Sequence, residues 1–141
     1  MAETVDEIVQ FEEPGDELDQ LAYEVIGAAL AVHKALGPGH AESVYVNALR
    51  VELEARRIPF EHEKSYQVYY RGTPVGAGRL DLLVAGKLIV EVKAAEELHS
   101  LFTSQVIAYL KANNLRLGLL INFNCVLLKN GVRRIAYSQK T

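Results

Sequence analysis

The chain contains a single cysteine, Cys125, so an intramolecular disulfide is excluded. This cysteine lies in the apolar stretch 121–128, where a buried thiol that acts as a small apolar side chain is the favoured interpretation. No charged-then-apolar signal segment opens the chain, and no apolar run approaches the length of a membrane span. We therefore expect a cytoplasmic protein. Its 141 residues, half of them hydrophobic, suffice for one domain with a buried core.

Several common functional motifs are also absent. The sequence has no P-loop, no glycine fingerprint for dinucleotides and no serine-hydrolase elbow. His40, His62 and His99 do not have metal-ligand spacing with one another. These absences argue against the enzyme classes that depend on such motifs.

Positive charge is missing from residues 1–19, which hold eight of the 18 acidic side chains and none of the 15 basic ones. The rest of the chain therefore carries 15 basic and ten acidic side chains, a formal charge of +5. A mildly basic domain suits a polyanionic partner. We interpret residues 1–15 as an acidic, disordered leader and residues 16–141 as the folded domain. In an alternative interpretation, the leader folds back and competes with nucleic acid.

Helical periodicity indicates the first two elements. Apolar residues recur at mainly helical spacing from roughly Asp16 to Leu36, and Gly37-Pro38-Gly39 ends that helix. A second helix is predicted from about Ala41 to Arg57, and Pro59 closes it. Three basic side chains of the second helix are expected to point to solvent: Arg50, Arg56 and Arg57.

The pattern then changes to that of strands. Residues Phe60 to Tyr70 alternate in part and are rich in aromatic and β-branched types, which predicts a strand. Gly72-Thr73-Pro74 is expected to form a turn. Two more strands are predicted, Val75 to Val84 and Leu88 to Lys93, around the loop Ala85-Gly86-Lys87.

The last third of the chain contains one helix and further strands. The helix is predicted from Leu98 to Asn113, and the continuous apolar run Leu115 to Phe123 is typical of a strand covered on both faces. Lys129-Asn130-Gly131 predicts a hairpin between Val126–Leu128 and Val132–Tyr137. The expected order is α-α-β-β-β-α-β-β, an α/β fold with a mixed sheet.

The loop around Gly86 has a consequence for three charged residues. If this loop has three residues, Asp81 lies opposite Glu91, and strand alternation places both on one face with Lys93. The opposite face then contributes core residues: Val84, Leu88, Val90 and Val92. A two-residue loop would break this cluster. In an alternative interpretation, whatever the loop length, the three residues are surface charges on an exposed sheet face, with Lys93 an ordinary ion-pair partner.

Two carboxylates directly opposite each other repel, so a fold rarely retains them without a compensating cation. Lys93 alone does not balance two negative charges. A divalent ion would, and carboxylate oxygens with water and phosphate oxygens suit Mg²⁺ or Mn²⁺. The pattern therefore predicts a metal site.

These residues resemble a known signature. Gly78-Arg79-Leu80-Asp81 followed by Glu91-Val92-Lys93 is similar to the D…(D/E)xK signature of the PD-(D/E)xK nuclease superfamily, with Leu80 where a proline is usual. Gly39-x-x-Glu42-x-x-Tyr45 resembles the motif of the small bacterial GxxExxY proteins, a branch of that superfamily. Two further segments resemble the same family: His33 to Gly39 and Gly118 to Phe123. On the predicted third helix, Gln105-x-x-x-Tyr109 is similar to an element of RecB-like exonucleases.

The resemblance spans about residues 18–137 and implies a restriction-endonuclease-like fold with assigned site residues. Asp81, Glu91 and the backbone carbonyl of Val92 would be metal ligands. Lys93 would orient the attacking water or stabilise charge on phosphorus. Glu42 would complete the metal shell, as in RecB-like and λ-exonuclease-like enzymes. Its alternative is an acidic residue favourably placed at a helix N-terminus.

Other residues have weaker assignments. The resemblance implies that Gln105 touches the site and that Tyr109 fixes it or the phosphate backbone, although a packed tyrosine with a satisfied glutamine is the alternative. Tyr45 would support Glu42 or simply belong to the core. His33 would either approach the site from the first helix or, as the favoured alternative, cap or pack. Four basic side chains are candidates for phosphate contacts: Arg50, Arg79, Lys111 and Arg116.

The expected function is a Mg²⁺- or Mn²⁺-dependent nuclease that hydrolyses phosphodiester bonds, in DNA rather than RNA. The alternatives are a non-catalytic nucleic-acid-binding or adaptor module with the same fold and a purely structural protein. Because the chain is close to a minimal core, a homodimer or a helicase-like partner would help it to grip a duplex.

Overall fold

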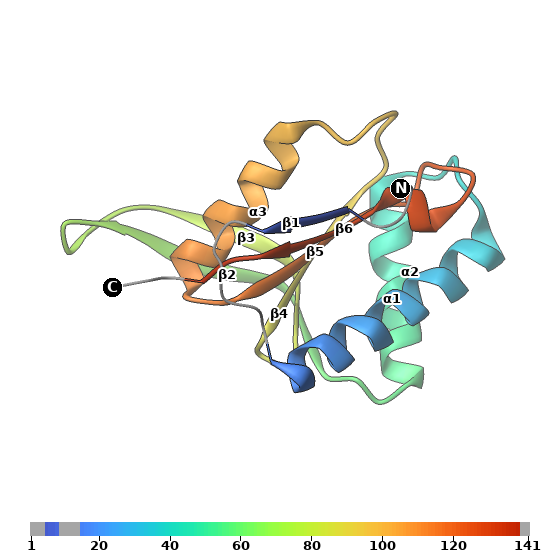
Figure 1. The fold of residues 1–141 in the computed structure, drawn as a ribbon, viewed down its shortest axis with the longest axis horizontal. Helices are drawn as coiled ribbons and strands as arrows, with labels where there is room; N and C mark the ends of the chain where they lie inside the picture. Colours follow the sequence, from blue (N-terminus) through green and yellow to red (C-terminus); the bar gives the residue numbers. More distant parts are fainter. Residues whose placement is uncertain (1–4, 9–14, 139–141) are drawn as a thin grey trace.

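The computed structural model describes residues 5–8 and 15–138 (Figure 1). Its helices and strands follow the predicted order, with one additional strand at the start. The helices are α1 (Asp16–Leu36), α2 (Glu42–Ala55) and α3 (Ser100–Asn113). The strands are β1 (Val5–Ile8), β2 (Phe60–Tyr70), β3 (Thr73–Val84), β4 (Leu88–Lys93), β5 (Leu117–Asn122) and β6 (Val132–Ala136). Within the described ranges, no helix is long and apolar enough to cross a membrane.

The six strands form one mixed sheet in the order β1-β6-β5-β4-β3-β2. β4 and β5 are parallel, because α3 connects them as a crossover, and β1 is parallel to β6; the other neighbours are antiparallel. Helices α1 and α2 cover one face, and α3 covers the other (Figure 1). Every residue of β5 is buried, which confirms the expectation of a strand covered on both faces.

The bounds of α1, β2 and β4 match the predicted ones. The predicted turn at Gly72-Thr73-Pro74 is shifted, because Arg71 and Gly72 form the turn with φ of 51° and 80°, and Pro74 already lies in β3. Positive φ at both central residues is the hairpin turn that matches strand twist. Pro74 has no N–H to give to a ladder, and the β2–β3 register shifts at its partner Tyr69.

The predicted hairpin at residues 129–131 is wrong. Leu128–Gly131 is a 3₁₀ helix, and β6 instead pairs with β5, with Val132 opposite Ile121. Val126 is 85% exposed, so the preceding segment contributes no buried strand. Gly131 lies against the carbonyl oxygen of Asn122, where a side chain would collide. The two backbones therefore approach each other closely here. The turn-forming residues at 129–131 give no indication of this contact, which is present where the sequence predicts a hairpin.

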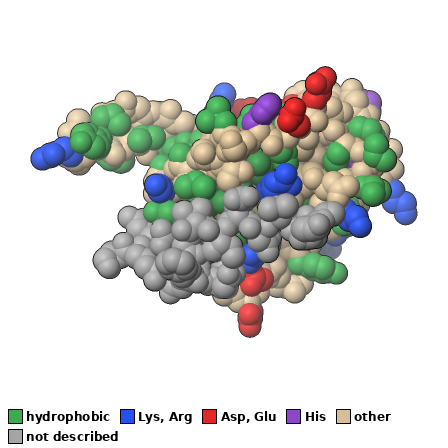
Figure 2. Space-filling model, turned by 45° about the horizontal axis from the view of Figure 1, so that its top comes forward, with side chains coloured by type: hydrophobic (Ala, Val, Ile, Leu, Met, Phe, Trp, Pro, Cys, Tyr) green, Lys and Arg blue, Asp and Glu red, His purple; other side chains and the backbone are tan. Residues whose placement is uncertain are grey.

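Within the expected acidic leader, residues 5–8 form β1 beside β6. The remainder of that leader, at residues 1–4 and 9–14, lies outside the described residues. At the other edge of the sheet, the distal parts of β2 and β3 form an arm that extends beyond the body (Figures 1 and 2). Tyr69 and Tyr70 are exposed on this arm.

Tyr45 connects the core to the loop that precedes α2. Its ring is buried and stacks on Phe123 with 4.7 Å between centroids. Its hydroxyl donates to the Gly37 carbonyl at 2.6 Å and accepts from the His40 N–H at 3.1 Å. Gly39 has φ of 111°, which favours glycine. Tyr45 is therefore a core residue whose hydroxyl also fixes where α2 begins.

We predict that Tyr45→Phe lowers the free energy of unfolding by about 1–3 kcal/mol, because two partners of the hydroxyl lose their hydrogen bonds while the stacking remains. Urea unfolding measures the change. Tyr23→Phe is the matched control, since Tyr23 lies on α1 with 72% of its surface exposed. Equal stability of the two variants would contradict the assigned role of the hydroxyl.

Candidate active site

The site forms where the β3–β4 ladder ends. The register runs from Val84 opposite Leu88 to Leu82 opposite Val90, which confirms the three-residue loop. Beyond that point, main-chain N–H groups donate to side-chain carboxylates and not to main-chain carbonyl groups. The Asp81 N–H donates to Glu91 Oε1 at 2.8 Å, and the Val92 N–H donates to Asp81 Oδ2 at 2.9 Å. Asp81 and Glu91 are therefore neighbours, and each is fixed by the backbone of the opposite strand.

Simple alternation fails at Asp81. Leu82 packs in the core under α1 and α2, whereas Leu80, two residues earlier, packs in the core under α3. The β2–β3 register omits Asp81 and the opposite Glu63, which has φ of 55°. The prediction that Asp81 shares one face with Glu91 and Lys93 is thus wrong for Asp81, because the strand turns over at this residue.

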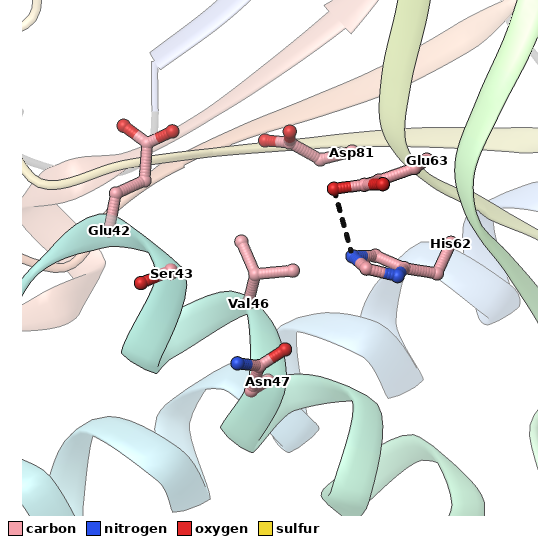
Figure 3. Close-up of a pocket in the computed structure, with 7 residues that line it drawn as sticks. All are labelled: Glu42, Ser43, Val46, Asn47, His62, Glu63 and Asp81. Carbon is pink, nitrogen blue, oxygen red and sulfur yellow. Dashed lines mark ion pairs between the residues drawn. The ribbon is translucent and has the colours of Figure 1, made fainter.

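The reversal lets Asp81 line a pocket beneath α2 (Figure 3). The pocket has a volume of about 360 Å³. Its walls come from the first turns of α2, the start of β2 and β3: Glu42, Ser43, Val46, Asn47, His62, Glu63 and Asp81. Figure 3 shows the Glu42 and Asp81 carboxylates on two sides of this pocket, with His62 and Glu63 beyond Asp81.

Sequence reasoning missed His62 and Glu63 as members of the site. His62 Nε2 lies 3.8 Å from Glu63 Oε2, so the two side chains form a pair at the pocket wall. His62 lacks metal-ligand spacing to other histidines, so its position in the sequence carries no signal of a site. The irregular backbone at Glu63, which turns this pair toward Asp81, has no counterpart in the residue pattern.

The three carboxyl groups lie in one electrostatic field. Glu91 is only 4% exposed, and its burial together with the charge of Asp81 raises its pKa to about 8, against the opposing effects of the Asp81 N–H and Lys93. Burial raises the pKa of Asp81, although the Val92 N–H and Lys93 oppose it. Burial and the charge of Asp81 also raise the pKa of Glu42. A nearby cation would relieve this accumulation of negative charge.

Helix α3 holds Lys93 beside the carboxylates. The Lys93 ammonium donates to Gln105 Oε1 at 3.3 Å and lies 4.6 Å from the centroid of the Phe102 ring. Gln105 is therefore in contact with Lys93. One turn later on α3, burial and the charge of Glu91 raise the pKa of Tyr109 to about 12. The Tyr109 ring packs edge-to-face on Tyr66 at 5.7 Å.

Two predicted substrate-binding residues lie away from this cluster. Lys111 is near the end of α3, and its ammonium lies 5.8 Å from the centroid of the Tyr137 ring. Arg79 is exposed and pairs with Glu63 at 3.4 Å, so it reaches the pocket only through that residue. His33 is buried, and its Nε2 lies 2.7 Å from the Cys125 carbonyl oxygen, which indicates a packing role.

Asn122 is a further support to which the sequence assigned no role. Its side chain accepts from the Ala95 N–H at 3.0 Å and donates to the Ala95 carbonyl at 2.9 Å. It also accepts from the Asn124 N–H at 3.2 Å. These bonds fix the chain just after Lys93 and so hold the end of β4 in place.

Comparison with protein families shows which family the chain belongs to. The family model of the PD-(D/E)XK nuclease superfamily matches residues 19–135. The chain belongs to this superfamily. No curated protein and no solved structure matches it. The match is to the PD-(D/E)XK superfamily as a whole, so the narrower resemblance to GxxExxY proteins and RecB-like enzymes remains a prediction.

At Asp81, Glu91 and Val92, the groups that could bind a metal ion are oxygen atoms. No three His, Cys, Asp or Glu side chains among residues 15–138 are grouped so that they hold a metal ion. Asp81 and Glu91 each use one oxygen on a main-chain N–H, and the other oxygen remains. The Val92 carbonyl faces the same strand as its N–H, toward Asp81. Two carboxylate oxygens and one carbonyl suit a hard cation that retains water ligands.

The raised pKa of Glu91 makes stability depend on pH. Glu91 binds its proton more tightly in the folded chain, so the stabilisation is present below the ordinary value of 4.5 and is lost as the pH rises toward about 8. In EDTA, we predict that the free energy of unfolding falls across this window. Urea unfolding at several pH values measures the slope.

Glu91→Gln should flatten this slope, because glutamine keeps the hydrogen-bonding shape without the titration. Glu96→Gln, at an exposed position, controls for the loss of one carboxylate. An unchanged slope in the Glu91 variant would contradict the assignment.

Proposed function

We propose that this protein is a Mg²⁺- or Mn²⁺-dependent nuclease that hydrolyses phosphodiester bonds in DNA. Its membership of the nuclease superfamily supports this proposal. The observation that carries it is the pair of hydrogen bonds that places Asp81 and Glu91 side by side, with Lys93 close to both. A buried carboxylate, a half-buried carboxylate that lines the pocket and a nearby ammonium group are the kinds of group that metal-assisted phosphodiester hydrolysis uses.

The proposed cation ligands are Asp81, Glu91 and the Val92 carbonyl. A divalent cation held at these oxygens would supply Lewis-acid stabilisation of the phosphate. The protein itself fixes the orientation of the ligands, because the Asp81 and Val92 N–H groups hold both carboxylates in place. Placing these charges close together costs free energy. This cost is already included when the β3–β4 hairpin folds, before substrate binds.

Lys93 is proposed to act on the water and the phosphate. Gln105 and the Phe102 ring hold its ammonium beside the carboxylates, so its position does not depend on substrate. From there it donates hydrogen bonds to the attacking water or to the charge that develops on the phosphate oxygens. Gln105 acts through Lys93 in this proposal and is a positioning residue. Tyr109, which is packed on Tyr66, is proposed to keep α3 against the site.

Glu42 is proposed as a further ligand from the opposite wall of the pocket. Its pKa responds to the charge of Asp81, so the two carboxyls share one field across the pocket. It is the first residue of α2, where the helix dipole also favours negative charge. These two roles differ in their consequences for the Mg²⁺ requirement and for the free energy of unfolding.

A non-catalytic nucleic-acid-binding module is the second candidate. The observation that favours it is the engagement of one oxygen of Asp81 and one of Glu91 by the main chain, with no group of three ligands among the described side chains. In this case, or for cutting a long duplex, a second copy or a helicase-like partner would add binding surface.

The first test is cleavage of labelled single- and double-stranded DNA and RNA with Mg²⁺, Mn²⁺ or EDTA. Wild type is expected to cut in either metal and not in EDTA. Asp81→Asn and Lys93→Met are each expected to lower the rate by at least about 100-fold, because they remove a ligand and a charge-stabilising group. Lys87→Met is the matched control, since Lys87 pairs with Glu17 at the far end of β4. Cutting that survives both site substitutions would overturn the proposal.

The second test compares Glu42→Gln with wild type in a titration with Mg²⁺. If Glu42 is a ligand, the variant needs about tenfold or more Mg²⁺ for half-maximal cleavage, in line with losses when metal-site groups are removed. If Glu42 acts only on the helix dipole, the free energy of unfolding falls by about 0.3–1 kcal/mol and the Mg²⁺ requirement stays constant. We expect the first result.

A further inference from the structure

A second hollow lies along α2 next to the candidate active site. It has a volume of about 560 Å³. Residues from the later turns of α2 and the start of β2 line it: Arg50, Glu54, Arg57, Ile58, Pro59 and Phe60. The candidate active site is likewise lined by α2 and the start of β2, through Asn47 and His62. The two hollows thus share the same pair of walls.

One hydrogen bond joins the two hollows. Arg50 Nη1 donates to Asn47 Oδ1 at 3.1 Å, and Asn47 lines the candidate active site. Asn47 and Arg50 are three residues apart, so they are neighbours on one helix face. Glu42 and Arg50 are eight residues apart, which corresponds to about 12 Å along the helix axis. The line from the candidate active site to Arg50 therefore follows one face of α2.

Arg50 is not the solvated side chain that the sequence predicts. It is half-buried, and its Nε is buried without a hydrogen-bond partner among the described residues. A buried donor without an acceptor is unfavourable, and such groups are uncommon in folded proteins. The planar guanidinium binds phosphate oxygens through two N–H groups at once. A phosphate oxygen in this hollow would contact the Nη groups of Arg50, because the Nε atom itself has almost no surface that a ligand can reach.

Arg57 provides a second positive charge in the same hollow. Its side chain is exposed, and it follows the end of α2, on the path that leads away from the candidate active site. Glu54 lies between the two arginines in sequence and lines the same hollow. Its negative charge opposes anion binding, so the hollow has a net charge of one positive unit from these three side chains.

We propose that Arg50 and Arg57 form a phosphate subsite. It binds the nucleic-acid strand at a phosphate remote from the bond to be cut. The nature of this ligand rests on the proposed function. The axial distance of about 12 Å from Glu42 to Arg50 is longer than one nucleotide step of a strand, so one phosphate cannot occupy both places. The subsite therefore contributes to strand affinity and takes no part in chemistry on the phosphate at Asp81.

The experiment measures fluorescence anisotropy of labelled DNA oligonucleotides in EDTA, where cutting does not interfere. For a ten-nucleotide strand, Arg50→Gln and Arg57→Gln are each expected to weaken binding by roughly tenfold. Each should also lower the slope of log affinity against log salt by about 0.7 for a single strand. Glu54→Gln should tighten binding, because it removes the opposing charge.

Arg56→Gln is the matched control for charge. Arg56 is adjacent to Arg57 but pairs with Glu52 at 2.7 Å and lies against Gly27 of α1. It is expected to change affinity by less than about twofold, because a loss of charge outside the contact is screened by salt. Thermal unfolding of each variant verifies that it folds, and Arg57→Gln tests the subsite at an exposed side chain if Arg50→Gln unfolds. Equal effects of the Arg50, Arg57 and Arg56 variants would overturn the subsite.

Strand length and turnover separate this inference from the proposed function. With Ca²⁺ in place of EDTA to hold a phosphate at Asp81, a dinucleotide is too short to reach Arg50 as well, so Arg50→Gln should weaken its binding less than that of the ten-nucleotide strand. An equal penalty at both lengths would overturn the subsite. Cleavage of bis(4-nitrophenyl) phosphate with Mn²⁺ should be lost in Asp81→Asn and retained in Arg50→Gln. If wild type fails to cleave but Arg50→Gln still weakens the long strand alone, the subsite stands and the nuclease proposal fails.

Discussion

The site depends on two crossed hydrogen bonds. The Asp81 N–H donates to Glu91, and the Val92 N–H donates to Asp81. They occupy the place of the next rung in the β3–β4 ladder. A normal rung would satisfy the backbone and leave both carboxylates free to separate. Here the carboxylates satisfy the backbone themselves, so neither can leave without exposing an unpaired N–H. The secondary structure therefore holds the two carboxyl groups close together despite their mutual repulsion.

This constraint explains why supports converge on the site from distant parts of the chain. Asn122 on β5 fixes the backbone after Lys93, and Gln105 on α3 fixes the Lys93 ammonium. Tyr45 fixes the loop that starts α2, and thereby the position of Glu42. Each support acts through hydrogen bonds to groups that the core already orients. The acidic cluster itself opposes folding, so the core and these bonds must supply the stabilisation that retains it.

The sequence predicts most of the frame because the relevant signals are local. Gly37-Pro38-Gly39 ends α1, and the three-residue loop at Gly86 sets the register that brings Asp81 beside Glu91. Both depend on backbone preferences within a few residues. The D…ExK spacing is a loose pattern by itself, and it indicates the superfamily because the flanking motifs occur with it in the expected order.

The failures have a tertiary origin. The strand turns over at Asp81 where the opposite residue on the neighbouring strand, Glu63, has positive φ, and no property of either residue alone predicts this irregularity. The 3₁₀ helix replaces a hairpin because Gly131 packs against the backbone at Asn122. Arg50 is half-buried because β2 begins beside the same face of α2. In each case the deciding contact joins segments that are separated in the sequence.

The distribution of charge sets the order of events at the proposed site. A phosphate strand that approaches the pocket meets Glu42, Asp81 and Glu91, whose burial and mutual repulsion already raise the pKa of Glu91 to about 8. Without a cation, this end of the path repels phosphate, whereas the end at Arg50 and Arg57 attracts it. A cation that binds the carboxylates removes the repulsion, so cation and strand must each increase the affinity for the other. On the proposed function, the arginine subsite anchors the strand through a region that becomes attractive only when the cation is present.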